Sequence, residues 1–503
     1  MSWFLGGIVF LILGYFTYGR LVERILGPDD RKTPALAQAD GVDYVPLPKW
    51  KNLLIQLLNI AGVGPVIGVV LGIKFGKVAL LIIPVGCVLM GGVHDFLAGM
   101  MSVRSRGANL PKIVSDCLGR GYARVFSWVM VALLLLCVTV FINVPANIID
   151  GEWLPQASAF WWIVALIFVY YVAATLFPVD KIIGKIYPIF GALLIVGSLA
   201  MAVALTWAGF RQPALMDDCA GFAGFQSRNP LFPCLFVTIA CGIISGFHAT
   251  QSPIVARTMR SEREARATFY GMMILEGVIA MVWAAGALAI YNQDAGLIAR
   301  QPAFVLTKIT THFLGGWMGG LTVLAVVILA VTSGDTALRS ARLSLGEMCG
   351  INQVPVIRRV LTCLPLILLV AVLLWWSNIS AKSFNHLWNY FAWGNQVISA
   401  TTLLCGVVWL VRQGKRAGAL VAAAPAVFMT TVVMSFILWA SADKGQPWGV
   451  VWKWTEGRLV NCGCPLGLAV ALGGAFALVL TVALYLRHGR EPSSSCCRKE
   501  SRS

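Results

Sequence analysis

Charged residues are scarce in this chain of 503 residues. Only 12% of the residues are charged and 58% are hydrophobic, whereas a soluble domain carries about a quarter charged residues. No polar stretch is long enough to form a large soluble domain. The composition therefore indicates an integral membrane protein, and it excludes a soluble enzyme or a soluble binding module.

Acidic residues are rarer than basic ones, which leaves a net charge of +17. The Lys and Arg residues lie in short loops between apolar runs and build no continuous basic surface. This distribution argues against nucleic acid as a partner and favours anionic membrane lipid.

Motifs of catalysis and metal binding are also missing. The five histidines are dispersed and form neither H-E-x-x-H nor G-x-S-x-G contexts. Cys462 and Cys464 lack a second cysteine pair, and the adjacent Cys496 and Cys497 permit either lipidation or an inert tail. We therefore expect no enzyme activity, no metal site and no cofactor. Charge rings and repeated pore loops, which are typical of channels, are absent from the sequence as well.

Apolar runs long enough to span a membrane dominate the chain. We predict thirteen spans, at 2–19, 51–72, 77–101, 125–147, 158–176, 185–208, 231–257, 268–291, 317–345, 356–375, 384–410, 416–440 and 464–487. Of the 39 Lys and Arg residues, 29 lie in or beside the loops after odd-numbered spans or in the C-terminal tail. The positive-inside rule then places the N-terminus outside and the C-terminus in the cytoplasm.

Two of the predicted spans contain residues that break helices. They are "IAGVGPVIGVVLG" (Ile60 to Gly72) and "IACGIISGFHATQSP" (Ile239 to Pro253). Such breaks are tolerated in hydrocarbon only where protein or a water-filled cavity satisfies the backbone. The two spans are five helices apart and so run in opposite directions, which predicts an inverted repeat with a binding site at the breaks.

Two carboxylates fall in the spans that follow the broken ones. Asp95 and Glu276 each lie about 14 Å of helical rise from the nearest cytoplasmic arginine, close to the middle of the bilayer. Intramembrane carboxylates are costly and mark either ion coupling or a packing salt bridge. His94, beside Asp95, is expected to point elsewhere and to line a polar interface.

The ninth span carries hydroxyl groups and a charged pair. Thr332 and Ser333 either complete an alkali-cation site or bond back to the preceding helical turn. Asp335 and Arg339, four residues apart, predict a local ion pair at the inner mouth, with closure of a gate as the sharper alternative.

Several of these motifs resemble the carbon starvation protein A (CstA) family. The matching segments are "GVDYVPLPKW", "IAGVGPVIG", "GGVHDF", "FVTIACGIISGFHATQSPIVARTMRSE", "FYGMMILEGVIAMVWAAGALAIY", "VTSGDTALRSAR" and "YFAWGNQ". The resemblance implies an all-α bacterial inner-membrane carrier with a LeuT-like five-plus-five inverted repeat and discontinuous helices. It also implies proton-coupled uptake of pyruvate, or uptake of peptides, during carbon starvation.

On that template the chain divides into five parts. They are an extra helix and cytoplasmic loop (1–50), a first repeat (51–208), a second repeat (231–410), two further helices (411–487) and a tail (488–503). The chain is shorter than the longest members of the family, and its Cys-Cys tail departs from their pattern. A sodium-coupled carrier of the same fold and a nutrient-sensing receptor are the alternatives. The oligomeric state is not predicted.

A carboxylate substrate suggests a role for each candidate residue, because the N-terminus of a half-helix attracts anions. The expected substrate-binding residues lie at the two breaks: Gly62, Gly64, Ser245, Gly246, His248 and Gln251. Asp95 or Glu276 would carry the coupled proton, with His248 as another candidate. Sodium held at Ala61, Thr332 and Ser333 is the alternative, and the ammonium of Lys185 is a third.

Overall fold

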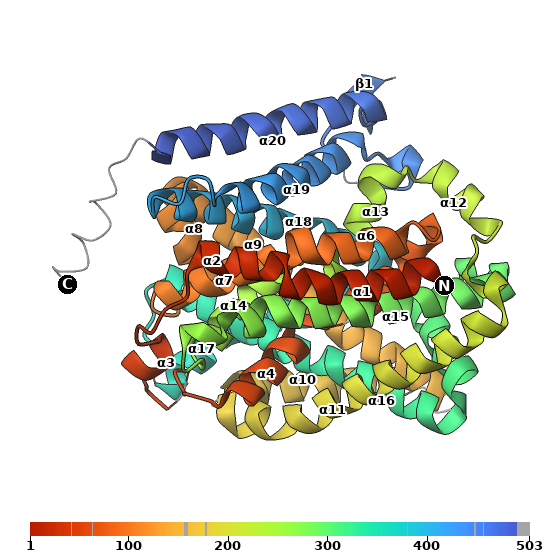
Figure 1. Ribbon diagram of the computed structural model, residues 1–503, viewed down its shortest axis with the longest axis horizontal. Helices are drawn as coiled ribbons and strands as arrows, with labels where there is room; N and C mark the ends of the chain where they lie inside the picture. Colours follow the sequence, from red (N-terminus) through yellow and green to blue (C-terminus); the bar gives the residue numbers. More distant parts are fainter. Residues whose placement is uncertain are drawn as a thin grey trace.

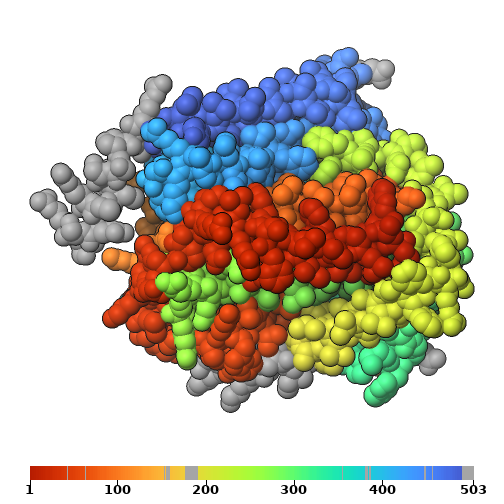
Figure 2. Space-filling model, in the orientation of Figure 1, coloured from red at the N-terminus to blue at the C-terminus, as the bar shows by residue number. Residues whose placement is uncertain are grey.

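The computed structural model describes residues 1–41, 43–62, 64–154, 159–176, 179–353, 355–379, 381–446, 449–455 and 457–489. Long helices run roughly side by side through the molecule, and the segment that ends the described chain lies along one edge (Figure 1). The space-filling view shows the N-terminal helices between the C-terminal helices and the middle of the chain (Figure 2).

The first half of the chain is almost entirely helical. Its elements are α1 (Ser2–Phe16), α2 (Tyr18–Leu26), α3 (Pro34–Ala37), α4 (Lys49–Ile60), η1 (Gly64–Gly68), α5 (Val69–Gly72), η2 (Ile73–Phe75), α6 (Ala79–Gly86), η3 (Cys87–Gly91), α7 (Gly92–Arg104), α8 (Leu110–Leu118), α9 (Arg120–Ile148), η4 (Ile149–Trp153), α10 (Phe160–Leu176), α11 (Val179–Arg211), η5 (Pro213–Met216) and α12 (Gly221–Arg228).

The second half adds one small sheet to its helices. Its elements are α13 (Leu231–Ile239), η6 (Ala240–Gly242), α14 (Gly246–Ala256), η7 (Glu262–Glu264), η8 (Arg266–Gly271), α15 (Met272–Gln293), η9 (Ala295–Ala299), α16 (Pro302–Met348), α17 (Val356–Ser377), α18 (Ala381–Arg412), α19 (Leu420–Trp439), η10 (Ala442–Lys444), β1 (Trp452–Thr455), β2 (Arg458–Asn461) and α20 (Leu466–Gly489). The antiparallel pair β1–β2 is a short hairpin between two spans, and the predicted all-α class of the membrane domain is confirmed.

Eleven helices in the described chain are long and apolar enough to cross a membrane, and the bent pair of α4 with the segment from η1 to η2 makes a twelfth. The prediction of thirteen spans was therefore too high by this criterion. The difference is α10, whose 17 residues rise about 25 Å and fall short of a hydrocarbon core of about 30 Å. All thirteen predicted segments nevertheless overlap helices of the structure.

The outer surface of the bundle carries large apolar side chains. Trp162 is 81% exposed on α10 and Trp317 is 82% exposed on α16, and leucines and valines of α11, α17 and α20 are exposed in the same way. A soluble protein rarely exposes contiguous apolar patches of this extent. The exposed surface therefore fits contact with lipid.

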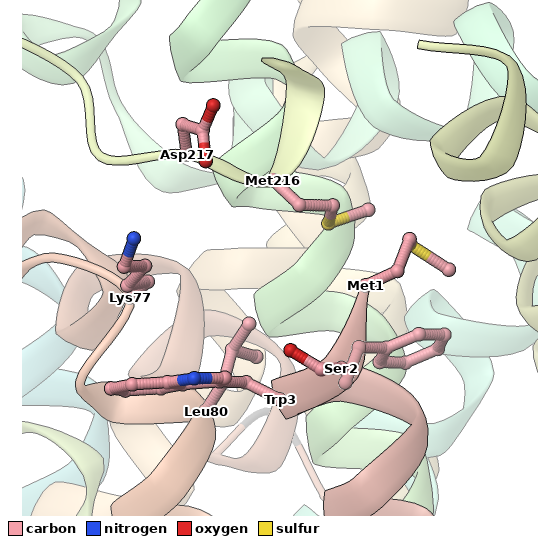
Figure 3. A pocket seen from close by; sticks show the side chains of 8 residues that line it. Met1, Ser2, Trp3, Lys77, Leu80, Met216 and Asp217 are labelled. Carbon is pink, nitrogen blue, oxygen red and sulfur yellow. The ribbon is translucent and has the colours of Figure 1, made fainter. Parts of the chain in front are cut away.

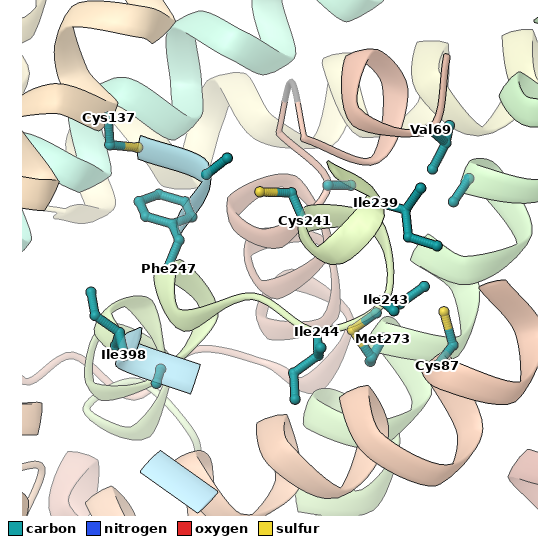
Figure 4. Close-up of a cluster of buried hydrophobic side chains, with 14 of the residues drawn as sticks. Val69, Cys87, Cys137, Ile239, Cys241, Ile243, Ile244, Phe247, Met273 and Ile398 are labelled. Carbon is teal, nitrogen blue, oxygen red and sulfur yellow. The ribbon is translucent and has the colours of Figure 1, made fainter. Parts of the chain in front are cut away.

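The two predicted helix breaks lie against each other. The chain leaves the helical path after α4 and again between η6 and α14, and the turn η1 packs against η6. Glycines allow this approach: a Cβ atom on Gly64 would lie 2.4 Å from the Cβ of Cys241, and one on Gly72 would lie 1.9 Å from Ile239. Figure 4 shows the chain passing from Cys241 of η6 through the non-helical residues Ile243 and Ile244 to Phe247 of α14.

A polar network closes the end of the bundle where the basic residues gather. Arg104, at the end of α7, donates to the buried carboxylate of Glu262 at 3.0 Å and to the carbonyl of Gly27 at 2.5 Å. Asp29, in the loop after α2, also contacts this network, and a hydrogen bond from Arg31 lowers the pKa of its carboxyl group. Three segments far apart in sequence are thereby fastened together.

We expect Arg104→Ala to destabilise the protein strongly. Removing one partner of a buried ion pair costs up to about 3 to 5 kcal/mol, because the other charge stays buried with poor compensation. The Glu262 side chain is fully buried and would keep only the more distant guanidinium of Arg31, at 3.7 Å. The midpoint of thermal unfolding in detergent should fall. Arg263→Ala is the matched control, because the pair of Arg263 with Asp30 is exposed and its loss should leave the midpoint unchanged. Equal midpoints for both variants would contradict this assignment.

Candidate functional site

A histidine between two carboxylates lies at the start of α14. The Nδ1 atom of His248 lies 3.0 Å from Oδ2 of Asp95 on α7, and its Nε2 atom lies 3.6 Å from Oε2 of Glu276 on α15. All three side chains are at most 1% exposed. The structure therefore brings together three residues that the sequence singled out separately.

The cluster contains a fourth titratable residue and unsatisfied atoms. Nδ1 of His94 lies 2.8 Å from Oδ1 of Asp95, so the expectation that His94 points elsewhere was wrong. Neither oxygen of Glu276, nor Nε2 of His94, has a hydrogen-bond partner in the part of the chain that the structure describes. Buried polar atoms without partners are uncommon in native proteins, and they point to a group that exchanges protons or binds a ligand.

The N-terminus of α14 is held by a residue of α18. The Phe247 amide donates to Oδ1 of Asn395 at 2.7 Å, and Nδ2 of Asn395 donates to Oγ of Ser245 at 2.8 Å. The amides of Ser245 and Gly246 make no hydrogen bond within the described residues. Two backbone donors at a helix N-terminus thus remain available to an anion.

Aromatic rings cover this N-terminus. The Phe247 ring stands edge-on to Phe141 of α9 at 5.7 Å, and Phe141 contacts Phe391 of α18 at 6.2 Å. A cavity of about 10 Å³ lies beside these rings and Asn395, and Figure 4 shows Phe247 directed towards Cys137. The cavity is too small for more than one water molecule, so the helices must separate before a substrate can bind.

The expected cation site lies where α16 meets the break after α4. Oγ of Ser333 donates to the carbonyl of Leu58 at 3.1 Å, and a Cβ atom on Gly62 would lie 3.0 Å from that hydroxyl. Thr332 bonds back to the carbonyl of Leu329, which is the alternative weighed for it above. Ala61 is buried at the same break. The structure thus brings a hydroxyl and a helix break together.

Other predicted residues lie elsewhere. Asp335 accepts a hydrogen bond from the hydroxyl of Tyr170 on α10 at 2.6 Å, and Arg339 donates to the carbonyl of Ala174. Gln251 is buried and contacts Ser340 of α16 rather than the histidine cluster. Lys185 lies in the part of α11 whose side chains are outside the described residues.

A larger cavity than the one beside the rings is remote from the cluster. It measures about 110 Å³ and lies at the beginning of α1 and α6, where Trp3, Lys77, Leu80 and Asp217 line it (Figure 3). Leu80 precedes Asp95 by fifteen residues on one bent span, which corresponds to about 22 Å of helical rise. We therefore assign the functional site to the buried cluster and not to this cavity.

Sequence reasoning missed Asn395 as a site residue. The signal was the polar pair in "YFAWGNQ" inside an apolar span, but only the fold shows that it meets α14. Sequence reasoning also missed the buried guanidinium of Arg257, which lies 3.3 Å from the Glu347 carboxylate. No metal-binding group of three or more His, Cys, Asp or Glu residues is found in the described chain.

The sequence of this chain matches a known protein family. The chain matches the family model described as "Carbon starvation protein CstA" over residues 1–175, 151–312 and 303–436. The chain belongs to the CstA family. It is accordingly a multi-pass membrane protein and a secondary transporter, not an enzyme.

Relatives within the CstA family carry different names. The chain is 40% identical to an "Uncharacterized membrane protein" of Haemophilus influenzae over 59% of this chain and 93% of that protein. It is 25% identical to "Peptide transporter CstA" of Escherichia coli, over 83% and 78% of the two chains. The "Pyruvate/proton symporter BtsT" of the same organism is 27% identical over 50% of this chain and 43% of its own length. Several curated relatives, including this symporter, are matched over less than half of their length.

Solved structures show the fold alone. MhsT in complex with L-phenylalanine superposes with a TM-score of 0.56 at 12% identity, over 88% of this chain and 99% of its own. A manganese transporter of Eremococcus coleocola gives 0.51 at 13% identity, over 90% and 99%. A sodium-coupled sialic acid symporter gives 0.50 at 12% identity, over 95% and 97%. The predicted LeuT-like architecture is confirmed.

Proposed function

We propose that this CstA-family protein is a proton-coupled symporter that imports pyruvate or short peptides across a bacterial inner membrane. One observation carries the proposal: the imidazole of His248 lies between the carboxylates of Asp95 and Glu276 in a fully buried site. Buried carboxylates within a membrane are costly and are kept for ion or proton coupling. The match to a relative named as a pyruvate/proton symporter supports the same conclusion.

The substrate carboxylate fits the N-terminus of α14. The amides of Ser245 and Gly246 supply donors and the positive end of the helix dipole supplies the charge, while Asn395 holds the first turn in place. Gly62 and Gly64 bring the other break close to it. The rings of Phe141, Phe247 and Phe391 then separate to admit substrate and close over it.

Proton transfer links this binding site to the carboxylates. Glu276 carries the coupled proton and is shielded by its neighbours, while His248 joins it to Asp95 and to the start of α14. A substrate that binds at α14 changes the electrostatic field at His248 directly. Binding of substrate and release of the proton are therefore coupled through one side chain.

Sodium coupling is the second candidate. The Ser333 hydroxyl faces the break after α4, and freed carbonyls with a hydroxyl suit a hard cation. The Ser333 hydroxyl donates to the Leu58 carbonyl, so the cation would have to displace that hydrogen bond. The cluster of His248, Asp95 and Glu276 favours proton coupling over sodium coupling.

The orientation follows from the distribution of basic residues. The network of Arg104 and Glu262 lies at the basic end of the bundle, which we assign to the cytoplasm, with the N-terminus outside. The aromatic rings then lie on the outer side of α14, and the network of Arg104 and Glu262 closes the inner side.

Asn395→Asp should weaken binding of carboxylate substrates by about tenfold or more, because a negative charge would face the anion at short range. The substitution keeps the acceptor for the Phe247 amide. It replaces the Nδ2 donor to Ser245 by an oxygen to which the Ser245 hydroxyl can itself donate, so both contacts at the start of α14 can persist. Affinity is measured by tracer binding to purified protein. Asn143→Asp is the matched control, since Asn143 is buried between α9 and α17. Equal loss of affinity in both variants would contradict the binding pose.

Counterflow identifies the substrate. Proteoliposomes loaded with unlabelled pyruvate, dipeptide or tripeptide are diluted into labelled compound, and transient accumulation marks a true substrate. Saturable counterflow by one compound supports the carrier. A flux that rises linearly with concentration would indicate a channel, and no flux with any compound would favour a nutrient-sensing receptor.

A further inference from the structure

Unsatisfied polar side chains lie along the contact between α4 and the beginning of α15. Gln56 and Asn59 on α4 are fully buried, and neither atom of either amide group has a hydrogen-bond partner within the described residues. The hydroxyl of Thr268 and the carboxyl oxygens of Glu276 also lack such partners there. Each buried polar group without a hydrogen-bond partner would lower the free energy of unfolding by about 1 to 3 kcal/mol, so this set of atoms needs an explanation.

The two segments run side by side in the same direction. α4 packs against both η8 and α15. At one end Glu264 lies within electrostatic reach of Lys49, the first residue of α4. At the other end Glu276 meets His248, which also contacts the carbonyl of Ile60, the last residue of α4. Both segments therefore extend from the basic end of the bundle to the histidine cluster, over about 17 Å.

The amides of α4 point towards this contact. Gln56 and Asn59 share a helical face with Asn52, which donates to the Thr258 carbonyl at 3.1 Å. Leu54 and Leu58 lie on the opposite face and pack near Gly191 of α11. The polar face of α4 is thus turned away from α11 and towards the segments that follow α14.

The facing segment carries polar groups as well. Thr268 lies in the π-helical turn η8, four residues after Glu264, and Glu276 follows eight residues later in α15. The adjacent rings of Phe269 and Tyr270 contact α7 instead. The hydroxyl of Thr268 is therefore directed away from α7.

The polar groups are spread along the contact. Gln56 and Asn59 lie about 10 and 15 Å along α4 from Lys49, while Thr268 lies in η8 towards the basic end and Glu276 in α15 at the histidine cluster. Bound waters between these groups would satisfy them, as waters commonly do for buried polar groups. Glu264 lies beyond Thr268 towards the basic end; it is half-buried, and its Oε2 atom also lacks a hydrogen-bond partner within the described residues.

The geometry points to a file of bound water between α4 and the segment from η8 to α15, through which Glu276 releases its proton to the cytoplasm. This inference rests on the proposed proton symport. The Glu276 carboxyl group loses a proton and becomes a carboxylate, and the water held by Asn59 takes the proton up. Transfer through the waters at Gln56 and Thr268 delivers it to the Glu264 carboxylate and then to bulk water. The amides and the hydroxyl orient the waters and keep their own protonation states.

Two transport assays separate this role from a structural one. Net uptake driven by a pH gradient needs proton release in every cycle, whereas exchange of substrate with substrate does not. We expect Thr268→Val and Gln56→Met to slow net uptake by about tenfold or more and to leave exchange within about twofold of wild type. Thr268→Ser, which keeps the hydroxyl, should retain net uptake. Thr310→Val is the matched control, because the Thr310 hydroxyl is buried but satisfied by carbonyls of α16.

The outcomes are distinct. Equal loss of net uptake and exchange in Thr268→Val would overturn the pathway, and so would unchanged net uptake in both variants. If no water is bound between α4 and the segment from η8 to α15, Gln56→Met should raise the midpoint of thermal unfolding and leave transport unchanged. That result would also overturn the pathway. Absence of proton-driven uptake in the wild-type protein would remove the proposed function itself.

Discussion

Glu276→Gln should abolish accumulation driven by a pH gradient, and uptake into proteoliposomes should fall to the level of empty liposomes. Glutamine has nearly the same shape as glutamic acid but cannot release a proton, so the carrier stays in the state that corresponds to protonated Glu276. Substrate exchange should persist, because a permanently neutral side chain still allows the loaded carrier to reorient. Asp95→Asn should reduce accumulation as well, since it removes the charge that His248 contacts at 3.0 Å.

A carboxylate far from the histidine cluster serves as the control for this experiment. Glu23→Gln changes the same chemical group in a half-exposed pair with Arg266 at the end of the bundle and should keep accumulation. Wild-type accumulation in both Glu276→Gln and Asp95→Asn would end the assignment of the coupled proton to these carboxylates. Loss of exchange together with uptake would indicate a folding defect instead, and size-exclusion chromatography would detect it.

His248→Ala should remove both substrate binding and transport. The imidazole lies between two buried carboxyl groups, and without it Asp95 and Glu276 both lose a partner beside the start of α14. The dissociation constant for substrate should rise by at least about tenfold, which corresponds to about 1.4 kcal/mol. Tracer binding to the purified protein measures this change.

Two further variants make the His248 result specific. His248→Gln keeps a hydrogen-bonding group of similar reach and tests whether folding alone explains the loss. His488→Ala removes a buried histidine near the end of α20, where it contacts Arg412, and this variant should bind substrate normally. Unchanged affinity in His248→Ala would make His248 a structural residue.

The arrangement of the spans and the main polar residues could be predicted from the sequence. A charge or a histidine inside an apolar run stands out locally, and for this reason Asp95, His248 and Glu276 were singled out. The glycine-rich breaks are local signals too, and the structure shows why they are glycines: Gly64 and Gly72 lie too close to Cys241 and Ile239 to carry a side chain.

The pairing of these residues could not be predicted, because it depends on how the helices pack. Nothing in the local sequence shows that Asn395 reaches the Phe247 amide or that Tyr170 donates to Asp335. The expectation for His94 failed because helical spacing gives the direction of a Cβ atom but not the rotamer. Gln56 and Asn59 read as ordinary polar residues until the fold showed that they are buried.

Uptake of labelled substrate by proteoliposomes with an imposed pH gradient tests the central claim most directly. The account predicts saturable accumulation when the interior is alkaline, with choline in place of sodium, and collapse of that accumulation when a protonophore is added. Accumulation that requires a sodium gradient and survives the protonophore would contradict the account and would assign coupling to the site of Ser333.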